Sequence, residues 1–319
     1  MAQKQGTWLR GLTGFMTDRK ISICISGAGV FGSHHAGKLA AHPRVDFAGV
    51  YDPEHPERAA ALVHKHGGIA FKTREDMIAA AQALIIASPA SVHYRQGIDA
   101  LRHGLHVLVE KPLATRLEDA REMVAMAEEN EVILQVGHQE RFVSGAIGLF
   151  DIPEIPLSIE AHRMTPFGTR GTDVSVTLDL MTHDLDLLNV LVGGEACEVR
   201  SQVRRSSEGR IDDAQAQITW PGGTRASIHA SRRATRRARN MRIEYPSGVV
   251  EIDFFNRSLV NGTPFALDED FAQKADAHDS LGAEVDAFVR AIVHGDKVPV
   301  CGVEGARALA LALRVDMAA

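Results

Sequence analysis

The stretch that decides the fold is ISICISGAGVFG at residues 21–32. Its first half is a short apolar run that predicts a buried strand, and its second half is the pattern G-x-G-x-x-G on Gly27, Gly29 and Gly32. The first glycine permits a tight turn, the second lets the backbone approach a pyrophosphate, and the third lets a helix pack closely on the strand. A helix that begins here presents free N–H groups to a phosphate. The stretch therefore predicts a dinucleotide site.

An acidic residue lies at the distance that this pattern requires. Asp52 follows Gly32 by 20 residues, at the end of a predicted strand over 45–51. A carboxylate there can accept a hydrogen bond from a ribose 2′-hydroxyl and would repel a 2′-phosphate. We therefore predict NAD rather than NADP as the cofactor. Val30 and Phe31, at the variable positions of the glycine pattern, are expected to contact it.

Strands and helices alternate through the rest of the first half. Such alternation predicts a parallel sheet with helices on both faces, which is a doubly wound Rossmann domain. We place this domain at residues 18–142. Further strands are predicted at 69–72, 83–87, 106–109 and 132–136, and helices at 32–42, 56–66, 91–103 and 117–129.

The second half has a different pattern, in which strands follow one another with turns between them. This pattern predicts an open, mostly antiparallel sheet in an α+β domain, which we place at 143–319. The helices are predicted from 179, at 283–294 and at 302–318. The strands are predicted at 159–164, 198–205, 214–220, 224–231, 240–245 and 249–254.

Composition excludes several classes of function. The net charge of −6 and the aromatic content of 5% argue against a nucleic-acid partner, and no apolar run is long enough to span a membrane. Cys24, Cys197 and Cys301 are odd in number and lack metal-site spacing, which indicates a reducing, cytoplasmic location. Residues 1–15 do not resemble a signal peptide, and we hypothesise that translation begins at Met16. The alternative is an ordinary N-terminal tail.

A lysine follows the predicted strand at 106–109, in the sequence Glu110-Lys111-Pro112. A lysine at the carboxyl edge of a parallel sheet points into the crevice where ligands bind. There it can donate a hydrogen bond to a developing alkoxide and stabilise its charge. The alternative is a solvated loop lysine, which the adjacent proline and the strand-end position make less favoured.

This segment resembles a known family. Together with the glycine pattern and with Ser88-Pro89-x-x-x-His93, it is similar to the Gfo/Idh/MocA oxidoreductases. The resemblance implies that Lys111 reaches both the substrate hydroxyl and the nicotinamide. It also implies that Glu110, Ser88, Pro89 and His93 line the cofactor site. The segment at 136–142, VGHQERF, resembles the family's G-x-x-x-R-F pattern, which flanks the nicotinamide.

A polar stripe begins the first helix of the second half. Asp179 and His183 are four residues apart, and this spacing puts them on one helix face within reach of each other. With Asp186, they resemble the family's third motif, in which the aspartate orients the histidine and the histidine removes the alcohol proton. An imidazole suits that task near neutral pH. A solvated helix face is the alternative. His183 and Asp186 alone are too few ligands for a metal, so we predict no metal site.

An arginine-rich segment at 231–242 contains six arginines. Arginine forks suit phosphate, so one hypothesis is that some of them bind the diphosphate of a nucleotide sugar. The favoured alternative is a solvated strand and turn. With the segment around Arg163, which is predicted to bind substrate, the chain resembles those family members that are UDP-N-acetylglucosamine 3-dehydrogenases or MviM-like proteins.

Three other histidines favour a structural interpretation over a functional one. His34 and His35 lie in the first turn of the predicted helix after the glycines, where a cofactor contact is the alternative to helix packing. His138 lies at a strand end, where a histidine more often serves as a hydrogen-bonded structural residue.

These observations predict an NAD-dependent dehydrogenase that oxidises a secondary hydroxyl of a sugar, cyclitol or nucleotide sugar. Lys111, Asp179 and His183 are the predicted catalytic residues, and Lys111, Arg163 and His183 the predicted substrate contacts. The alternative is a regulatory protein that binds a dinucleotide or sugar without turnover. The resemblance implies a homodimer or homotetramer, with the second sheet used for subunit contacts.

Overall fold

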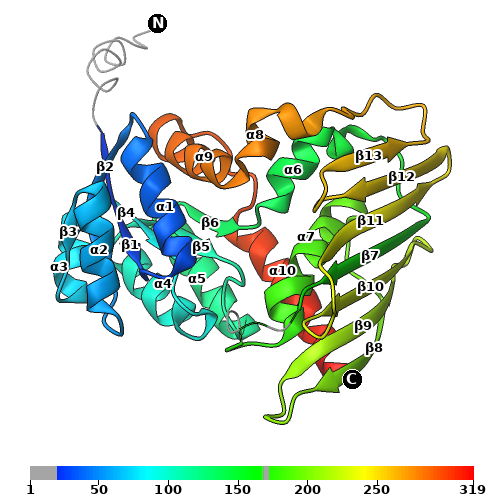
Figure 1. The fold of residues 1–319 in the computed structure, drawn as a ribbon, viewed down its shortest axis with the longest axis horizontal. Coiled ribbons are helices and arrows are strands. Elements are labelled where there is room, and N and C mark those ends of the chain that lie inside the picture. The colour runs from blue at the N-terminus through cyan, green and yellow to red at the C-terminus, as the bar shows by residue number, and fades with distance from the viewer. Residues whose placement is uncertain (1–19, 167, 169–171) are drawn as a thin grey trace, which may run out of the picture.

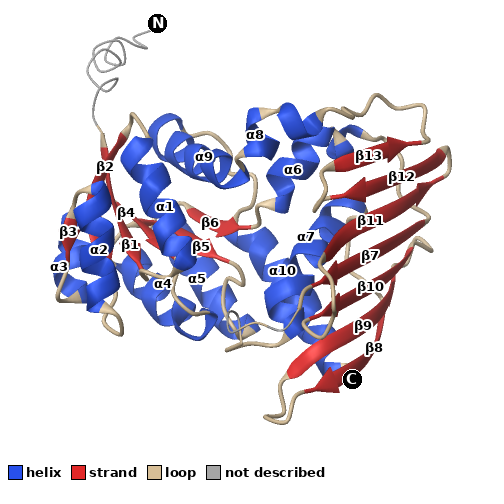
Figure 2. Cartoon of the chain, viewed as in Figure 1, coloured by secondary structure: helices blue, strands red, loops and turns tan. Residues whose placement is uncertain are grey.

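The computed structural model describes residues 20–166, 168 and 172–319 (Figure 1). The hypothetical start at Met16 lies outside these residues, as does most of the predicted loop at 168–171. The chain forms two sheets, each with its own helices, which stand side by side (Figure 2). No helix of the described residues is long and apolar enough to cross a membrane.

The first sheet has six parallel strands in the order β3-β2-β1-β4-β5-β6. This confirms the predicted Rossmann domain. Its strands are β1 (Ile21–Ser26), β2 (Val45–Tyr51), β3 (Ile69–Ala70), β4 (Ala83–Ile86), β5 (His106–Glu110) and β6 (Leu134–Gly137). Its helices are α1 (Val30–Ala41), α2 (Pro56–His66), α3 (Arg74–Ala80), α4 (His93–Arg102) and α5 (Leu117–Glu129). The strand order reverses between β1 and β4, so their carboxyl ends open the crevice in which such sheets bind ligands.

The second sheet has seven strands in the order β13-β12-β11-β7-β10-β9-β8. Only β7 and β10 run parallel, so the predicted mostly antiparallel sheet is confirmed. Its strands are β7 (Ser158–Met164), β8 (Glu198–Arg205), β9 (Ile211–Thr219), β10 (Arg225–Ser231), β11 (Ala238–Tyr245), β12 (Gly248–Asp253) and β13 (Ser258–Asn261). Their apolar side chains alternate toward one face, as in Ala214, Ala216 and Ile218, and this face packs on helices.

Helices from the second half of the chain cover both sheets. They are α6 (Glu140–Ile147), α7 (Thr182–Leu191), α8 (Ala275–His278), α9 (Ser280–His294) and α10 (Gly302–Met317). Helix α9 packs against α1, because Val285, Phe288 and Val289 form a buried stripe at helical spacing. Helix α10 contacts both α5 and α7. The predicted domain division between residues 142 and 143 falls within α6.

Four elements were not predicted. They are α3, α6, α8 and β13, which are only four to eight residues long. The helix predicted from residue 179 also begins differently, because residues Thr177–Met181 form a π-helical turn that leads into α7. Cys24, in β1, is fully buried, and burial raises the pKa of its thiol to about 12.

The outer face of the second sheet bears no helix of the described residues (Figure 2). This is the face that the predicted subunit contacts would use. The homodimer or homotetramer stays a prediction, and so does the cytoplasmic location.

Candidate active site

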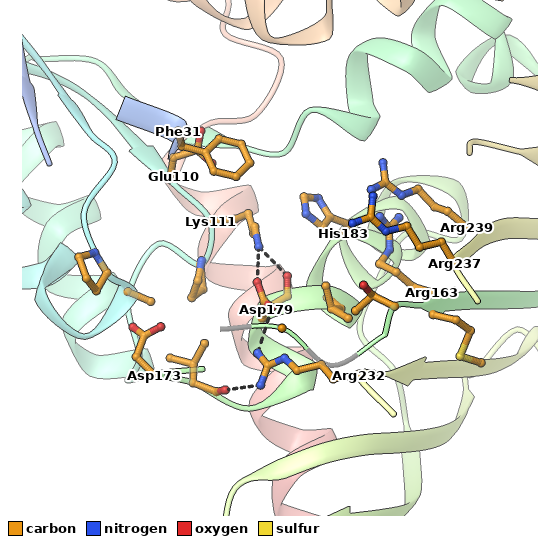
Figure 3. Close-up of a pocket in the computed structure, with 18 of the residues that line it drawn as sticks. Phe31, Glu110, Lys111, Arg163, Asp173, Asp179, His183, Arg232, Arg237 and Arg239 are labelled. Atoms are coloured by element: carbon orange, nitrogen blue, oxygen red, sulfur yellow. Dashed lines mark hydrogen bonds and ion pairs between the residues drawn. The ribbon is translucent and has the colours of Figure 1, made fainter. Parts of the chain in front are cut away.

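A cavity of about 690 Å³ lies between the two sheets, at the carboxyl edge of the parallel strands. This volume is in the range of small-molecule sites. Its lining comes from both halves of the chain, and Figure 3 shows the side chains that face one another across it. Phe31, Glu110 and Lys111 lie on the side of the first sheet, and Asp179 and His183 on the side of the second.

The backbone geometry at the three glycines of the G-x-G-x-x-G pattern fits the roles that were predicted for them. Gly27 has a φ of 99°, and a Cβ added to it would lie 2.7 Å from the backbone nitrogen of Ser88. A Cβ on Gly32 would lie 2.0 Å from the carbonyl oxygen of Gly27, so helix and strand touch there. A Cβ on Gly29 would meet nothing within 4 Å. Gly29 therefore borders the open space that a pyrophosphate needs.

The start of α1 offers further groups to a dinucleotide. Gly29 caps the helix without a side-chain bond, so the first-turn N–H groups are available to an anion. Val30 and Phe31 are 46% and 41% exposed, and Phe31 lines the cavity. These residues fit a bound dinucleotide, whose contacts with them stay a prediction.

Asp52 lies partly exposed at the end of β2. Its Oδ2 accepts a hydrogen bond from the backbone nitrogen of Ala28 at 2.7 Å, and its Oδ1 accepts one from that of His55 at 2.9 Å. Asp52 thus holds the glycine loop while its carboxylate remains accessible. This geometry fits the predicted contact with a ribose hydroxyl.

The loop after β4 is fastened to the loop after β5 by His93. The two ring nitrogens lie 2.8 and 2.9 Å from the carbonyl oxygens of Pro112 and Ser88. His93 is buried, and burial lowers the pKa of its ring. Its predicted cofactor contact is untested. Because both ring nitrogens face backbone oxygens, His93 has a structural role and holds together the two loops that line the cavity. Ser88 and Pro89 line the cavity itself.

Lys111 is tied to the π-helical turn of the second half. Its Nζ donates to Oδ1 of Asp179 at 2.8 Å and to the carbonyl oxygen of Asp179 at 2.6 Å (Figure 3). Oδ2 of Asp179 accepts a hydrogen bond from the buried Arg232 at 3.0 Å. Burial alone would raise the pKa of Asp179, but the charges of Lys111 and Arg232 outweigh it and lower this pKa. The alternative of a solvated Lys111 is thus excluded.

The predicted contact between Asp179 and His183 is wrong for this structure. The spacing argument assumed an α-helix, whereas Asp179 lies in the wider π turn, and Lys111 and Arg232 take both of its carboxylate oxygens. Nδ1 of His183 has no hydrogen-bond partner in the described part of the chain. Its ring instead meets the ring of His138 edge-on, with centroids 5.8 Å apart.

The surroundings of His183 favour the neutral form of its imidazole. Burial lowers its pKa well below the usual value, and the nearby charges of Arg163 and Lys111 lower it further. A neutral ring facing the cavity can accept a proton.

Arg163 lines the cavity, but carboxylates already hold its guanidinium. Its Nε and Nη2 donate to Asp184 at 2.9 and 2.8 Å, and its Nη1 donates to Glu140 at 3.0 Å. The predicted substrate contact therefore stays a prediction. In the structure, the ion pairs of Arg163 link Glu140 and Asp184 beside the cavity. Sequence reasoning missed Glu140 and Asp184, because only the fold brings them to Arg163. Asp186, from the third motif, pairs with Arg141 of the VGHQERF segment in the same way.

Some residues of the arginine-rich segment fit the diphosphate hypothesis and others fit the alternative of a solvated strand and turn. Arg232 is buried and structural, while Arg233 and Arg236 are exposed. Arg237 and Arg239 line the cavity and point toward His183 (Figure 3). The described lining carries more cations than carboxylates, although the chain is net acidic: Lys111, Arg163, Arg232, Arg237 and Arg239 against Glu110, Asp173 and Asp179.

Glu110 borders the cavity but is only 6% exposed, and its predicted contact with the cofactor stays a prediction. Its Oε1 lies 2.8 Å from Nε2 of His35. The favoured packing interpretation of His35 is therefore confirmed, and His34 is exposed.

Both halves of the chain match family profiles. Residues 21–138 match the profile described as "Oxidoreductase family, NAD-binding Rossmann fold". Residues 143–251 match the one described as "GFO/IDH/MocA C-terminal domain". The first of these matches agrees with the NAD site that was predicted from the glycines and Asp52.

Known proteins resemble the chain over most of its length. The UDP-N-acetylglucosamine 3-dehydrogenase of Acidithiobacillus ferrooxidans is 36% identical over 307 residues, which cover 92% of this chain and 96% of the relative. A solved structure of that enzyme superposes with a TM-score of 0.85 at 35% identity, over 94% of this chain and 97% of the other. An inositol 2-dehydrogenase of Burkholderia vietnamiensis is 32% identical over 225 residues, 66% of this chain and 60% of the relative.

Proposed function

This chain belongs to the Gfo/Idh/MocA family of oxidoreductases, and we propose that it uses NAD to oxidise a secondary hydroxyl on the sugar of a nucleoside diphosphate sugar. Among its relatives are dehydrogenases of a nucleotide sugar and of a neutral cyclitol. The observation that favours the nucleotide sugar is the cationic wall of the cavity. The exposed guanidinium groups of Arg237 and Arg239 in this wall suit a diphosphate and give no advantage to a neutral polyol.

The chemistry divides between the two sides of the cavity. Bound NAD supplies a nicotinamide ring that accepts the hydride. His183 takes the hydroxyl proton, because its ring lines the cavity and its lowered pKa favours the neutral form, which can accept a proton. Lys111 donates a hydrogen bond to the same oxygen and offsets the negative charge that develops there. Removal of that proton is what allows the carbon to release hydride.

Asp179 is a positioning residue for Lys111 in this scheme, and not for His183. Its two bonds to Nζ, through Oδ1 and the backbone carbonyl, fix the ammonium group in the cavity. Arg232 holds the other carboxylate oxygen and offsets the charge of Asp179. Lys111 therefore keeps a net positive field for the reacting oxygen.

Arg237 and Arg239 are the proposed diphosphate ligands. Arg239 shares Glu140 with Arg163 through one nitrogen, at 3.0 Å, and no side-chain bond to a described residue occupies its other nitrogens, which can serve a ligand. Phe255 also lines the cavity and is 51% exposed. It lies next to this arginine pair, because the backbone nitrogen of Phe254 bonds the carbonyl oxygen of Arg239 at 2.8 Å. An exposed ring there offers a stacking surface to the base.

The test is turnover. The purified protein is mixed at pH 8 with NAD or NADP and with UDP-N-acetylglucosamine, other UDP-sugars, free N-acetylglucosamine or myo-inositol, and NADH formation is followed by fluorescence. We expect turnover with NAD and a UDP-sugar. Turnover of myo-inositol alone would reject the nucleotide sugar. NAD binding without turnover of any of these substrates would favour the regulatory alternative.

A further inference from the structure

Three buried titratable groups meet behind the wall of the cavity. His35 comes from α1, Glu110 from the end of β5 and Glu284 from α9. Their exposed fractions are 0%, 6% and 0%, and one nitrogen or oxygen from each lies within 4.8 Å of the others. The proposed mechanism uses none of these side chains directly.

The two carboxyl groups of this cluster have different partners. Glu110 has His35, whose Nε2 lies 2.8 Å from its Oε1. Neither side-chain oxygen of Glu284 has a hydrogen-bond partner in the part of the chain that the structure describes. The nearest recorded contact is to its backbone, where the carbonyl oxygen accepts a bond from Nε2 of Gln135 at 3.0 Å.

These partners decide which carboxyl group keeps its charge. Two carboxylates this close cannot both stay ionised in a buried site that holds one imidazole. The proton belongs on the group without a donor, which is Glu284. The pKa of Glu284 supports this assignment, because burial and then the charge of Glu110 raise it well above the usual value.

We propose that Glu284 is a positioning residue that remains a neutral carboxylic acid in the folded enzyme and supports the His35–Glu110 pair. Glu110 directly precedes Lys111, and His35 belongs to the helix whose first turn receives the cofactor. The cluster therefore joins the cofactor helix, the Lys111 loop and α9 at one buried point. The kinetic consequence rests on the proposed function, but the protonation state does not.

The decisive variant is Glu284→Gln, because an amide has the shape of a neutral acid and cannot ionise. The pKa of Glu284 is higher in the folded state than in the unfolded state. Between these two pKa values, the stability of the wild type falls as the pH rises, because only the unfolded glutamate can ionise freely. An amide does not ionise, so the variant avoids this loss. We expect Glu284→Gln to raise Tm at pH 8 by about 2 °C. The gain should shrink toward zero as the pH falls below 4.5, where the unfolded glutamate also becomes protonated.

Glu140→Gln is the matched control, since Glu140 is also buried but its carboxylate bonds Arg163 and Arg239. Burial alone would raise the pKa of Glu140, but the two arginines lower it. Its stabilising contribution is present above the unfolded pKa and lost as pH falls. Glu140→Gln should therefore lower Tm at pH 8, opposite to Glu284→Gln.

Infrared spectroscopy detects the protonation state of the Glu284 carboxyl group directly. The wild type should show the carbonyl stretch of a buried protonated carboxylic acid at pH 8, and Glu284→Gln should lack it. In turnover, the kcat of Glu284→Gln should stay within about twofold of the wild type. The kcat of Glu284→Leu should fall about tenfold, because leucine removes the polar group that positions the Lys111 loop.

A fall in Tm at pH 8 for Glu284→Gln, or a wild type without the carbonyl band, would overturn the proposal. Elemental analysis would then ask whether a metal ion holds an ionised Glu284. The Tm and infrared measurements need no substrate. If no sugar is oxidised but both measurements behave as expected, the proposed function fails and the assignment of Glu284 stands.

Discussion

The cofactor side and the substrate side of this cavity are built in different ways. On the cofactor side, Gly27, Gly29 and Gly32 act through the backbone within six consecutive residues. On the substrate side, charged side chains hold one another across the chain. Lys111 meets Asp179 at a separation of 68 residues, and Arg232 meets it at 53.

The difference teaches where a sequence carries its information. A backbone site needs a local pattern, so its residues can be found without the fold. A network of buried ion pairs is defined by which residues meet, and each member alone resembles an ordinary charged residue. Substitutions on the two sides should therefore fail in different ways.

The largest effect is expected from His183→Asn. Removing the base should lower kcat by about 10²- to 10⁴-fold, because a general base contributes that much. NAD affinity, measured by fluorescence titration, should change little, since His183 lies on the substrate side. Arg233→Met, at an exposed position outside the cavity lining, is the control. If His183→Asn keeps most of its kcat, another group removes the proton.

A pair of glycine variants tests the cofactor side. Gly29→Ala places a methyl group in empty space, so Tm should stay near the wild type while the Kd for NAD rises by about tenfold or more, a loss of about 1.4 kcal/mol. Gly32→Ala drives a Cβ against the carbonyl of Gly27, so Tm itself should fall. Thermal melts and NAD titrations separate the two. A Gly29→Ala protein that binds NAD normally would place the pyrophosphate elsewhere.

Arg237→Met tests the cationic wall. Losing one charged hydrogen bond to a diphosphate costs about 1.5 kcal/mol or more, so KM for a UDP-sugar should rise about tenfold with a smaller change in kcat. Added salt should raise the KM of the wild type by a larger factor than that of the variant. Arg236→Met, whose side chain is exposed in the same segment, serves as the matched control. Equal KM values for the two variants would contradict the diphosphate assignment.

The outcome of the sequence analysis follows the same division. The two sheets, the glycine loop, Asp52 and the placement of Lys111 at the cavity were predicted, because each depends on local patterns. The partner of Asp179 was not, since the π turn that redirects it leaves no clear mark on the spacing. Glu284 was missed as well, because it is one polar residue in an amphipathic helix until the fold brings His35 and Glu110 close to it.

The smallest effect is expected from Asp52→Asn. Asp52 lies on the cofactor side, but its predicted effect on cofactor choice comes from its charge and not from the backbone. An exposed like-charge contact contributes about 1 kcal/mol or less, so the ratio of kcat/KM for NADP to that for NAD should rise by no more than about fivefold. The amide oxygen can still accept the bond from Ala28, so the glycine loop should hold, while the exposed bond from the backbone nitrogen of His55 is lost and Tm should fall slightly. Both kcat/KM values are measured on the same UDP-sugar. An unchanged ratio would mean that Asp52 supports the loop without facing the ribose, and its charge would then say nothing about cofactor choice.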